Sequence, residues 1–156
     1  MHENEEQTLI IIKPDAIHRG LLGEITHRFE RKGLKLIGMK MTTLDEGTLE
    51  EHYAHHADKP FFEDLKRFMQ EAPVVLMVLS GIDAIKATRN VVGDTAGHKA
   101  EPGSIRGDFA MSVQSNLVHA SDSPETAEAE INLFFDDHEL YEYQRNDFSA
   151  VFFDAD

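Results

Sequence analysis

The chain has 156 residues, a common length for one domain with a sizeable core, and no linker divides it, so we expect a single domain over residues 1–156. Its 29 acidic residues outnumber 15 basic ones, and the formal net charge of -14 disfavours broad binding to nucleic acids, whose phosphates such a surface repels. There is no cysteine and no apolar run long enough to span a bilayer, which excludes disulfides, thiolate metal sites and a membrane protein.

The N-terminus, MHENEEQ, lacks the basic flank and the apolar core of a signal peptide. We therefore expect a soluble, cytoplasmic protein. The excess of acidic residues also suits a cytoplasm of very high salt, where screening weakens repulsion between carboxylates.

The first predicted strand runs from Thr8 to Lys13 and stops at Pro14; its three isoleucines favour burial on both faces. A helix follows and ends at Gly33, because apolar residues recur there at helical spacing: Leu22, Ile25 and Phe29. Residues 34–44 then alternate apolar and polar, which predicts a strand that is half exposed or at an edge.

Two short helices should separate this strand from the next. Asp45 can cap the first, and Lys59-Pro60 breaks the chain before the second. The histidines at their bend, His55 and His56, lie next to Tyr53 and raise the possibility of a metal site. Adjacent histidines point in different directions, so surface histidines are the simpler interpretation.

A second buried strand is predicted from Pro73 to Gly81. Asp83 can cap the following helix, which Gly93 ends. Arg89 falls near the last turns of this helix, where neutralising the helix dipole is the ordinary role of a basic residue.

The stretch from residue 93 to 115 is longer than an ordinary connection, and long loops in compact domains tend to be functional or disordered. Gly103 and Gly107 flank Arg106 and allow tight turns. We therefore expect an ordered, functional loop here rather than a helix.

His119 follows an apolar pair that can end a buried strand, and it precedes a helix start marked by Ser123 and Pro124. An imidazole is poised between charged and neutral near pH 7, so it can act as nucleophile, base or metal ligand. The alternative is a histidine that is simply hydrogen-bonded in the interior. Glu130, on the following helix, could reach back to His119, although the pattern alone favours a solvated glutamate.

The order of elements is β-α-β-αα-β-α-β-α. Two split βαβ units with right-handed crossovers give an α+β fold, a four-stranded antiparallel sheet covered by helices in the ferredoxin-like arrangement. The tail from Asp136 to Asp156 is too apolar to be free, so we expect its aromatics between Phe148 and Phe153 to be covered by this subunit or by another.

Five motifs carry a resemblance to a known family: IIKPD at 11–15, HY at 52–53, PFF at 60–62, PGSIRGDF at 102–109 and NLVHASDS at 116–123. In this order and spacing they strongly resemble the nucleoside diphosphate kinases, and in their acidic bias those of salt-loving archaea. The resemblance covers nearly the whole chain. It implies a ferredoxin-like subunit, hexamers built as trimers of dimers, and transfer of a γ-phosphoryl group from nucleoside triphosphates to nucleoside diphosphates.

On that resemblance, His119 accepts the phosphoryl group in a ping-pong reaction, Glu130 orients its ring and Ser121 bonds nearby. The phosphates would be held by five residues: Arg89, Thr95, Arg106, Tyr53 and Lys13. The nucleoside would be held by Lys13 and Asn116 at the sugar and by Phe61 and Val113 on the two faces of the base. Magnesium would bridge phosphates, with Asp122 approaching it through water.

Ala120 stands where this family commonly has glycine, which is tolerable if its φ angle is negative. The rival hypothesis is a non-catalytic ferredoxin-like module that binds nucleotides or a partner. The joint presence of five family residues argues against that rival: His119, Arg106, Lys13, Asn116 and Glu130.

Overall fold

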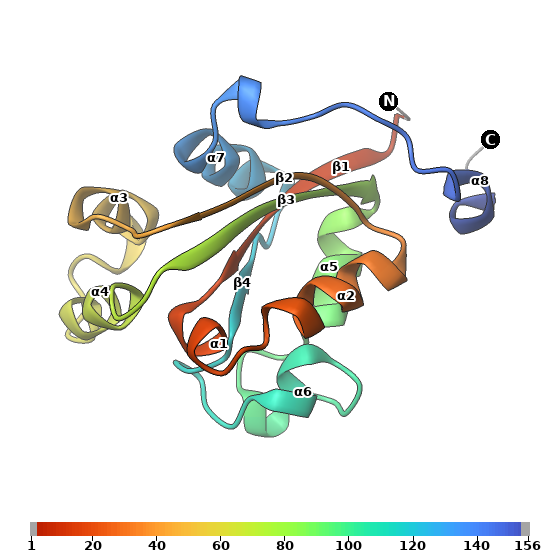
Figure 1. Ribbon diagram of the computed structural model, residues 1–156. Coiled ribbons are helices and arrows are strands. Elements are labelled where there is room, and N and C mark those ends of the chain that lie inside the picture. The colour runs from red at the N-terminus through yellow and green to blue at the C-terminus, as the bar shows by residue number, and fades with distance from the viewer. Residues whose placement is uncertain (1–2, 154–156) are drawn as a thin grey trace.

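The computed structural model describes residues 3–153 and contains a four-stranded antiparallel sheet of order β2-β3-β1-β4 (Figure 1). The strands are β1 (Glu5–Ile12), β2 (Lys35–Thr42), β3 (Val74–Ile82) and β4 (Val118–Ala120). This order, with every neighbouring pair antiparallel, confirms the ferredoxin-like α+β arrangement.

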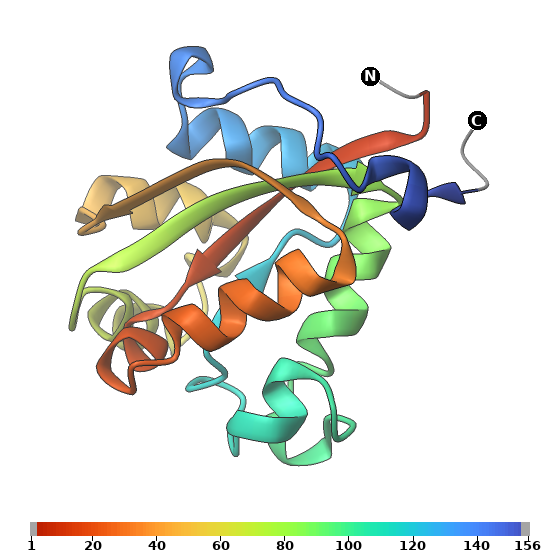
Figure 2. The same cartoon turned by 45° about the vertical axis from the view of Figure 1, so that its right-hand side comes forward.

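The helices form a layer on each face of the sheet (Figure 2). One core lies under α2 (Leu22–Lys32) and α5 (Ala84–Val92). The other lies under α3 (Glu46–His52), α4 (Phe62–Met69) and α7 (Pro124–Phe134). Three shorter helices lie at the ends of the fold: α1 (Pro14–His18), α6 (Ile105–Phe109) and α8 (Phe148–Val151).

Strand β1 supplies both cores, as its run of isoleucines predicts. Ile10 and Ile12 pack toward α2 and α5, whereas Leu9 and Ile11 pack toward α3, α4 and α7. All four side chains are fully buried. Because successive side chains of a strand point to opposite faces, such a strand must be apolar throughout. Strand β2 lies at the edge of the sheet, also as expected.

Four predicted helix ends are confirmed, among them Gly93, which ends α5 with a φ angle of 90°. The Asp45 carboxylate accepts a hydrogen bond from the Thr48 N–H, and the Ser123 hydroxyl accepts one from the Thr126 N–H. Gly33 ends α2 with a φ angle of 107°. The cap predicted at Asp83 is wrong: its side chain makes no capping bond, and the carboxylate of Glu6 accepts from the Ile85 N–H instead.

The loop predicted between residues 93 and 115 is also wrong in one respect, because Arg106 lies on helix α6. Ser104 caps this helix by accepting a hydrogen bond from the Gly107 N–H. Gly107 serves close packing rather than a turn, since a Cβ atom there would collide with the carbonyl of Glu101. Of the two glycines that flank Arg106, Gly103 does form the predicted turn, with a φ angle of 97°, whereas Gly107 lies within α6. The cap residue Ser104 carried the signal for the helix.

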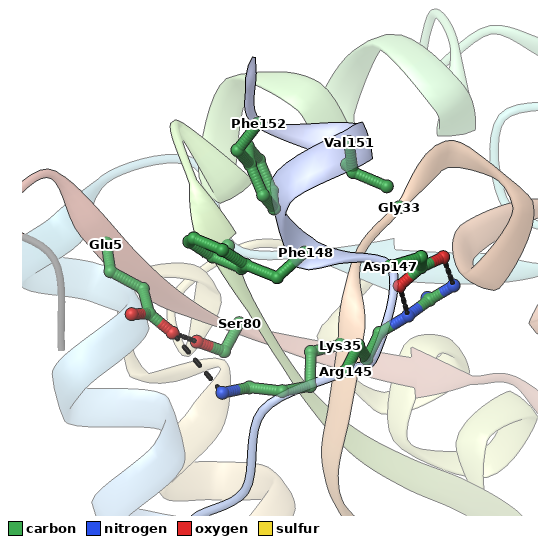
Figure 3. A pocket seen from close by; sticks show the side chains of 10 residues that line it. Glu5, Gly33, Lys35, Ser80, Arg145, Asp147, Phe148, Val151 and Phe152 are labelled. Atoms are coloured by element: carbon green, nitrogen blue, oxygen red, sulfur yellow. Dashed lines mark hydrogen bonds and ion pairs between the residues drawn. The ribbon is translucent and has the colours of Figure 1, made fainter. Parts of the chain in front are cut away.

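The chain after α7 crosses the open side of β2 and ends in α8 beside Gly33 and Gly81 (Figures 1 and 3). Phe148 and Phe152 are half-buried there, whereas Phe153 is 80% exposed. This subunit thus covers two of the three tail phenylalanines in part, and cover of Phe153 by another subunit stays a prediction. Residues 154–156, the end of the predicted apolar tail, lie outside the described residues.

Among the helices formed by residues 3–153, none is long and apolar enough to cross a membrane.

Candidate active site

The site is built around the short strand β4. His119 lies opposite Ile11 in the antiparallel pairing with β1, so its side chain points to the same face as Ile11, toward α3 and α7. The His119 side chain is 24% exposed. A histidine on a three-residue edge strand is thus held by a buried neighbour and still open to a ligand.

Behind His119 lies the carboxylate of Glu130, which α7 carries. Its Oε2 is 2.8 Å from His119 Nε2, and its Oε1 accepts a 2.6 Å hydrogen bond from the Ser121 hydroxyl. Burial acts to raise the pKa of Glu130, but the nearby donors of His119 and Ser121 outweigh it, so the pKa is lowered and the carboxylate is ionised. The Ser121 hydroxyl also accepts a bond from the Leu9 N–H, which fixes it to the sheet.

Leu117, two residues before His119, has an unusual backbone with a φ angle of 76°. A branched residue is strained in this left-handed region, and such strain persists where surrounding bonds hold it. The Leu117 N–H donates to Asp15 Oδ2, and its carbonyl accepts from the Lys13 N–H. These two bonds fasten the start of β4 to the first turn of α1 and to the residue that follows β1.

Lys13 and Asn116 meet beside this turn, with 2.7 Å between Lys13 Nζ and Asn116 Oδ1. Burial and then the charge of Arg106 lower the pKa of Lys13 to about 8, although Asp15 opposes them. Asn116 also donates to the carbonyl of Thr95. The lysine is therefore a desolvated cation whose charge is available to an anion below about pH 8.

Arg106 is 4% exposed, and it donates to three backbone carbonyls, of Gly93, Asn116 and Val118. Burial and then the charge of Arg89 lower its pKa to about 10, yet it stays protonated at neutral pH. Arg89 donates to the carbonyl of Ala120 rather than to the end of its own helix. Two guanidinium groups thus converge on β4, on either side of His119 in sequence.

The other predicted residues lie around this centre. Tyr53 is buried, and both burial and Glu130 raise the pKa of its hydroxyl, so it stays protonated. Phe61 and Val113 are 46% and 56% exposed. Asp122 is exposed in a groove between α3 and α7. The ring of His56 packs against the ring of Phe61, with 5.2 Å between the ring centroids.

A family model described as nucleoside diphosphate kinase matches residues 6–140. The chain belongs to the nucleoside diphosphate kinase family. It is thus a phosphotransferase, and the match takes in every site residue described above.

Relatives in this family span almost the whole chain. A nucleoside diphosphate kinase from Pyrococcus abyssi is 53% identical and covers 93% of this chain and 94% of its own length. One from Parabacteroides distasonis is 51% identical, with coverages of 94% and 96%. Among solved structures, a halophilic nucleoside diphosphate kinase from Halobacterium salinarum in complex with CDP has a TM-score of 0.92 and 44% identity, over 94% of this chain and 98% of the other.

The departure from the family pattern at Ala120 does not distort the strand. Among residues 3–153, only Asp83 and Leu117 have a positive φ angle without being glycine. Ala120 is a buried residue of β4 and its methyl group is part of the core under α2 and α5. Alanine is therefore compatible with this nucleoside diphosphate kinase backbone.

The sequence interpretation missed one residue of the site. His52, at the end of α3, lies against His119 with 5.0 Å between ring centroids, and its Nδ1 is 3.5 Å from Glu130 Oε2. Its side chain is 2% exposed. The only signal was the motif HY at 52–53, in which attention fell on the tyrosine and on the histidines that follow.

Proposed function

We propose that this chain transfers the γ-phosphoryl group of a nucleoside triphosphate to a nucleoside diphosphate through a covalent phosphohistidine at His119. The observation that carries the proposal is the 2.8 Å approach of His119 Nε2 to the Glu130 carboxylate. With the proton on Nε2, the lone pair of the neutral imidazole is on Nδ1. A half-buried nucleophile oriented by an ionised partner is an arrangement that suits nucleophilic catalysis.

In the first half-reaction, His119 Nδ1 attacks the γ-phosphorus, the bond to the β–γ bridging oxygen breaks, and the nucleoside diphosphate leaves with that electron pair. The ring keeps its Nε2 proton and becomes positively charged, and the ionised Glu130 offsets this charge. A terminal oxygen of a second diphosphate then attacks the phosphorus and the P–N bond breaks. One site thus serves donor and acceptor in turn, which is a ping-pong sequence.

The phosphates would be held by the cations and donors that converge on β4. Arg106, Arg89 and Lys13 supply positive charge, and Thr95 and Tyr53 supply hydroxyl groups. Charge-assisted bonds of this kind stabilise the charge that develops on a transferring phosphoryl group. Three of the five guanidinium N–H groups of Arg106 bind backbone carbonyls, which leaves donors for a phosphate.

The nucleoside would lie between the exposed side chains of Phe61 and Val113, with Lys13 and Asn116 at the sugar hydroxyls. Stacking on an aromatic face discriminates little between bases. We therefore expect a broad choice of nucleotides.

The carboxylate of Asp122 suits a magnesium ion. Asp122 is an exposed carboxylate three residues after His119, and Mg²⁺ prefers oxygen ligands while it keeps several waters. Asp122 would bind, through water, the magnesium ion that accompanies the phosphates of the nucleotide. When bound, the ion neutralises phosphate charge during transfer.

We also infer the oligomeric state of the protein, its compartment and its salt environment. Family membership favours a cytoplasmic hexamer built from dimers. The exposed side chains of Met39 and Met41 on β2, at 44% and 59%, offer an apolar contact to another subunit. The net charge of -14 favours a halophilic protein, and the relative from Halobacterium salinarum is described as halophilic.

The test is phosphoenzyme formation with radiolabelled ATP. The wild-type protein should give an acid-labile, base-stable phosphoprotein and should pass the label to a diphosphate, whereas His119→Gln should do neither. Gln keeps polarity and approximate bulk, so ADP binding, measured by calorimetry, should persist in the variant. Exchange by His119→Gln at the wild-type rate, with contaminating kinase excluded, would contradict the phosphohistidine. Nucleotide binding by a wild-type protein that forms no phosphoenzyme would favour the non-catalytic module.

A further inference from the structure

His52 is a buried polar side chain that the proposed reaction does not use. Its ring lies edge-on to the ring of His119, at an interplanar angle of 86°, and it also contacts Tyr53 and Phe134. With a side chain that is 2% exposed, it can exchange few bonds with water. It thus forms part of the wall against which the nucleophile rests.

Neither ring nitrogen of His52 has a hydrogen-bond partner of good geometry within residues 3–153, and the 2.8 Å approach of His119 Nε2 to Glu130 is likewise poorly aligned for a hydrogen bond. Buried polar atoms without partners are few in folded proteins, because each costs free energy of folding. The Nδ1 of His52 lies 3.5 Å from Glu130 Oε2, the same oxygen that faces His119 Nε2. A shift of about half an ångström would turn this approach into a hydrogen bond of ordinary length.

His52 is neutral in this position. Burial, followed by the charge of His119, lowers the pKa of His52 to about 4, and Glu130 opposes them. His55 and Lys13 add to the lowering. A neutral imidazole can donate one N–H to the carboxylate without bringing a second positive charge beside His119, and such a charge would disfavour the phosphorylated, cationic ring.

We propose that His52 is a positioning residue for phosphoryl transfer: its ring holds the plane of the His119 imidazole, and its Nδ1–H shares the Glu130 carboxylate. The inference rests on the proposed function of His119. Glu130 alone can hold His119 Nε2 while the imidazole ring still rotates about that contact. The ring of His52, packed against the ring of His119, prevents this rotation. Holding Nδ1 in line with the phosphorus matters because a misplacement of about 1 Å can cost about 100-fold in rate.

Two substitutions distinguish the effect of the aromatic ring of His52 from the effect of its proposed hydrogen bond to Glu130. His52→Phe keeps an aromatic ring against His119 but removes both nitrogens. His52→Asn places an amide N–H near the position of Nδ1 and removes the ring. His55→Asn is the matched control, since His55 lies in the same bend but is exposed.

The readouts are the single-turnover rate of phosphoenzyme formation from labelled ATP, by rapid quench, and the Kd of ADP, by calorimetry. For His52→Phe we expect a rate about 10-fold lower or more, with the Kd of ADP within about 2-fold of wild type. His52→Asn should recover part of the rate. His55→Asn should match the wild type in both.

A wild-type rate in His52→Phe would overturn the proposal, and so would a loss of ADP affinity as large as the loss of rate, since His52 would then shape the pocket. If phosphoenzyme formation in His52→Asn were no faster than in His52→Phe, the proposed hydrogen bond from His52 to Glu130 would be wrong. Should either variant fail to fold, ring ¹⁵N spectra of the wild-type enzyme decide: phosphorylation of His119 should shift the His52 nitrogens, and unshifted signals would contradict the proposal. A wild-type enzyme that forms no phosphohistidine would instead refute the proposed function.

Discussion

The cluster around His119 and the C-terminal segment, residues 141–153, both pack on the sheet, but with opposite chemistry. The cluster buries polar groups, among them the 4% exposed Arg106 and the unpaired ring of His52. The C-terminal segment half-buries Phe148 and Phe152 and keeps its charged Arg145 near the surface. Burial of polar groups costs stability and burial of apolar groups supplies it. Substitutions in the first region should therefore lower activity beyond any loss of stability, whereas substitutions in the second should lower stability alone.

Two arginines give the sharpest test of this contrast, because each donates to backbone carbonyls. Arg106 binds three of them beside His119, whereas Arg145 binds those of Glu30 and Leu34 at the end of α2. Arg106→Ala should slow phosphoryl transfer about 10²- to 10³-fold, as expected for loss of a preorganised donor to the transferring group. The phosphoenzyme should still form, slowly.

Arg145→Ala should leave the transfer rate within about 2-fold of wild type and lower the melting temperature, because two carbonyls lose a charged donor. Both rates are to be measured well below the melting temperature of each variant. Equal losses of activity in the two variants would break the contrast between the regions.

The second prediction concerns the contact between α2 and α8 shown in Figure 3. A Cβ atom on Gly33 would collide with Val151, and the φ angle of Gly33 is one that alanine avoids. Gly33→Ala should lower the free energy of unfolding by about 1 to 3 kcal/mol with unchanged activity of the folded enzyme, measured by urea titration.

Val151→Ala added to Gly33→Ala should recover part of that loss, because it removes the colliding methyl groups and leaves only the backbone strain. Strictly additive effects would mean that α8 does not pack there in solution. Deletion of residues 148–156 should likewise lower the melting temperature or weaken assembly, and a truncated protein of unchanged mass and melting point would contradict a structural role for the segment.

The third prediction uses the lowered pKa of Lys13, about 8. The lysine is charged below this pH and neutral above it, so affinity for ADP should fall, by up to about 10-fold, as the pH rises from 7 to 9. The phosphates of ADP do not titrate in the upper part of this window. Lys13→Gln should bind ADP more weakly and without this pH dependence, as calorimetry can check. An equal decline in the Gln variant would assign the titration to another group.

The smallest effect should come from salt. Repulsion among the carboxylates behind the net charge of -14 weakens as the Debye length falls from about 10 Å at 0.1 M to about 3 Å at 1 M. Melting temperature and sedimentation, followed from low to high KCl, should show greater stability and more complete assembly. An unchanged melting temperature and assembly state would exclude screening as a main support of this fold.

Much of the fold could be predicted because its signals are local. The isoleucines of β1, the cap residues Asp45 and Ser123 and the terminal Gly33 each act within a few positions of themselves. The order of elements then restricts the topology to a split βαβ sheet. The candidate site residues were identified as a set, because their motifs are specific when taken together.

The arrangement inside the site was decided by tertiary structure alone. Nothing near His52 in the chain indicates that its ring meets His119, because α3 and β4 come together only after the sheet has formed. The strained backbone of Leu117 likewise depends on bonds from Asp15 and Lys13, about 100 positions away in sequence. Local propensity disfavours both features, a left-handed leucine and a buried imidazole without a good partner. They persist because packing from both sides of the sheet outweighs the local free energy, and this balance is invisible in the sequence.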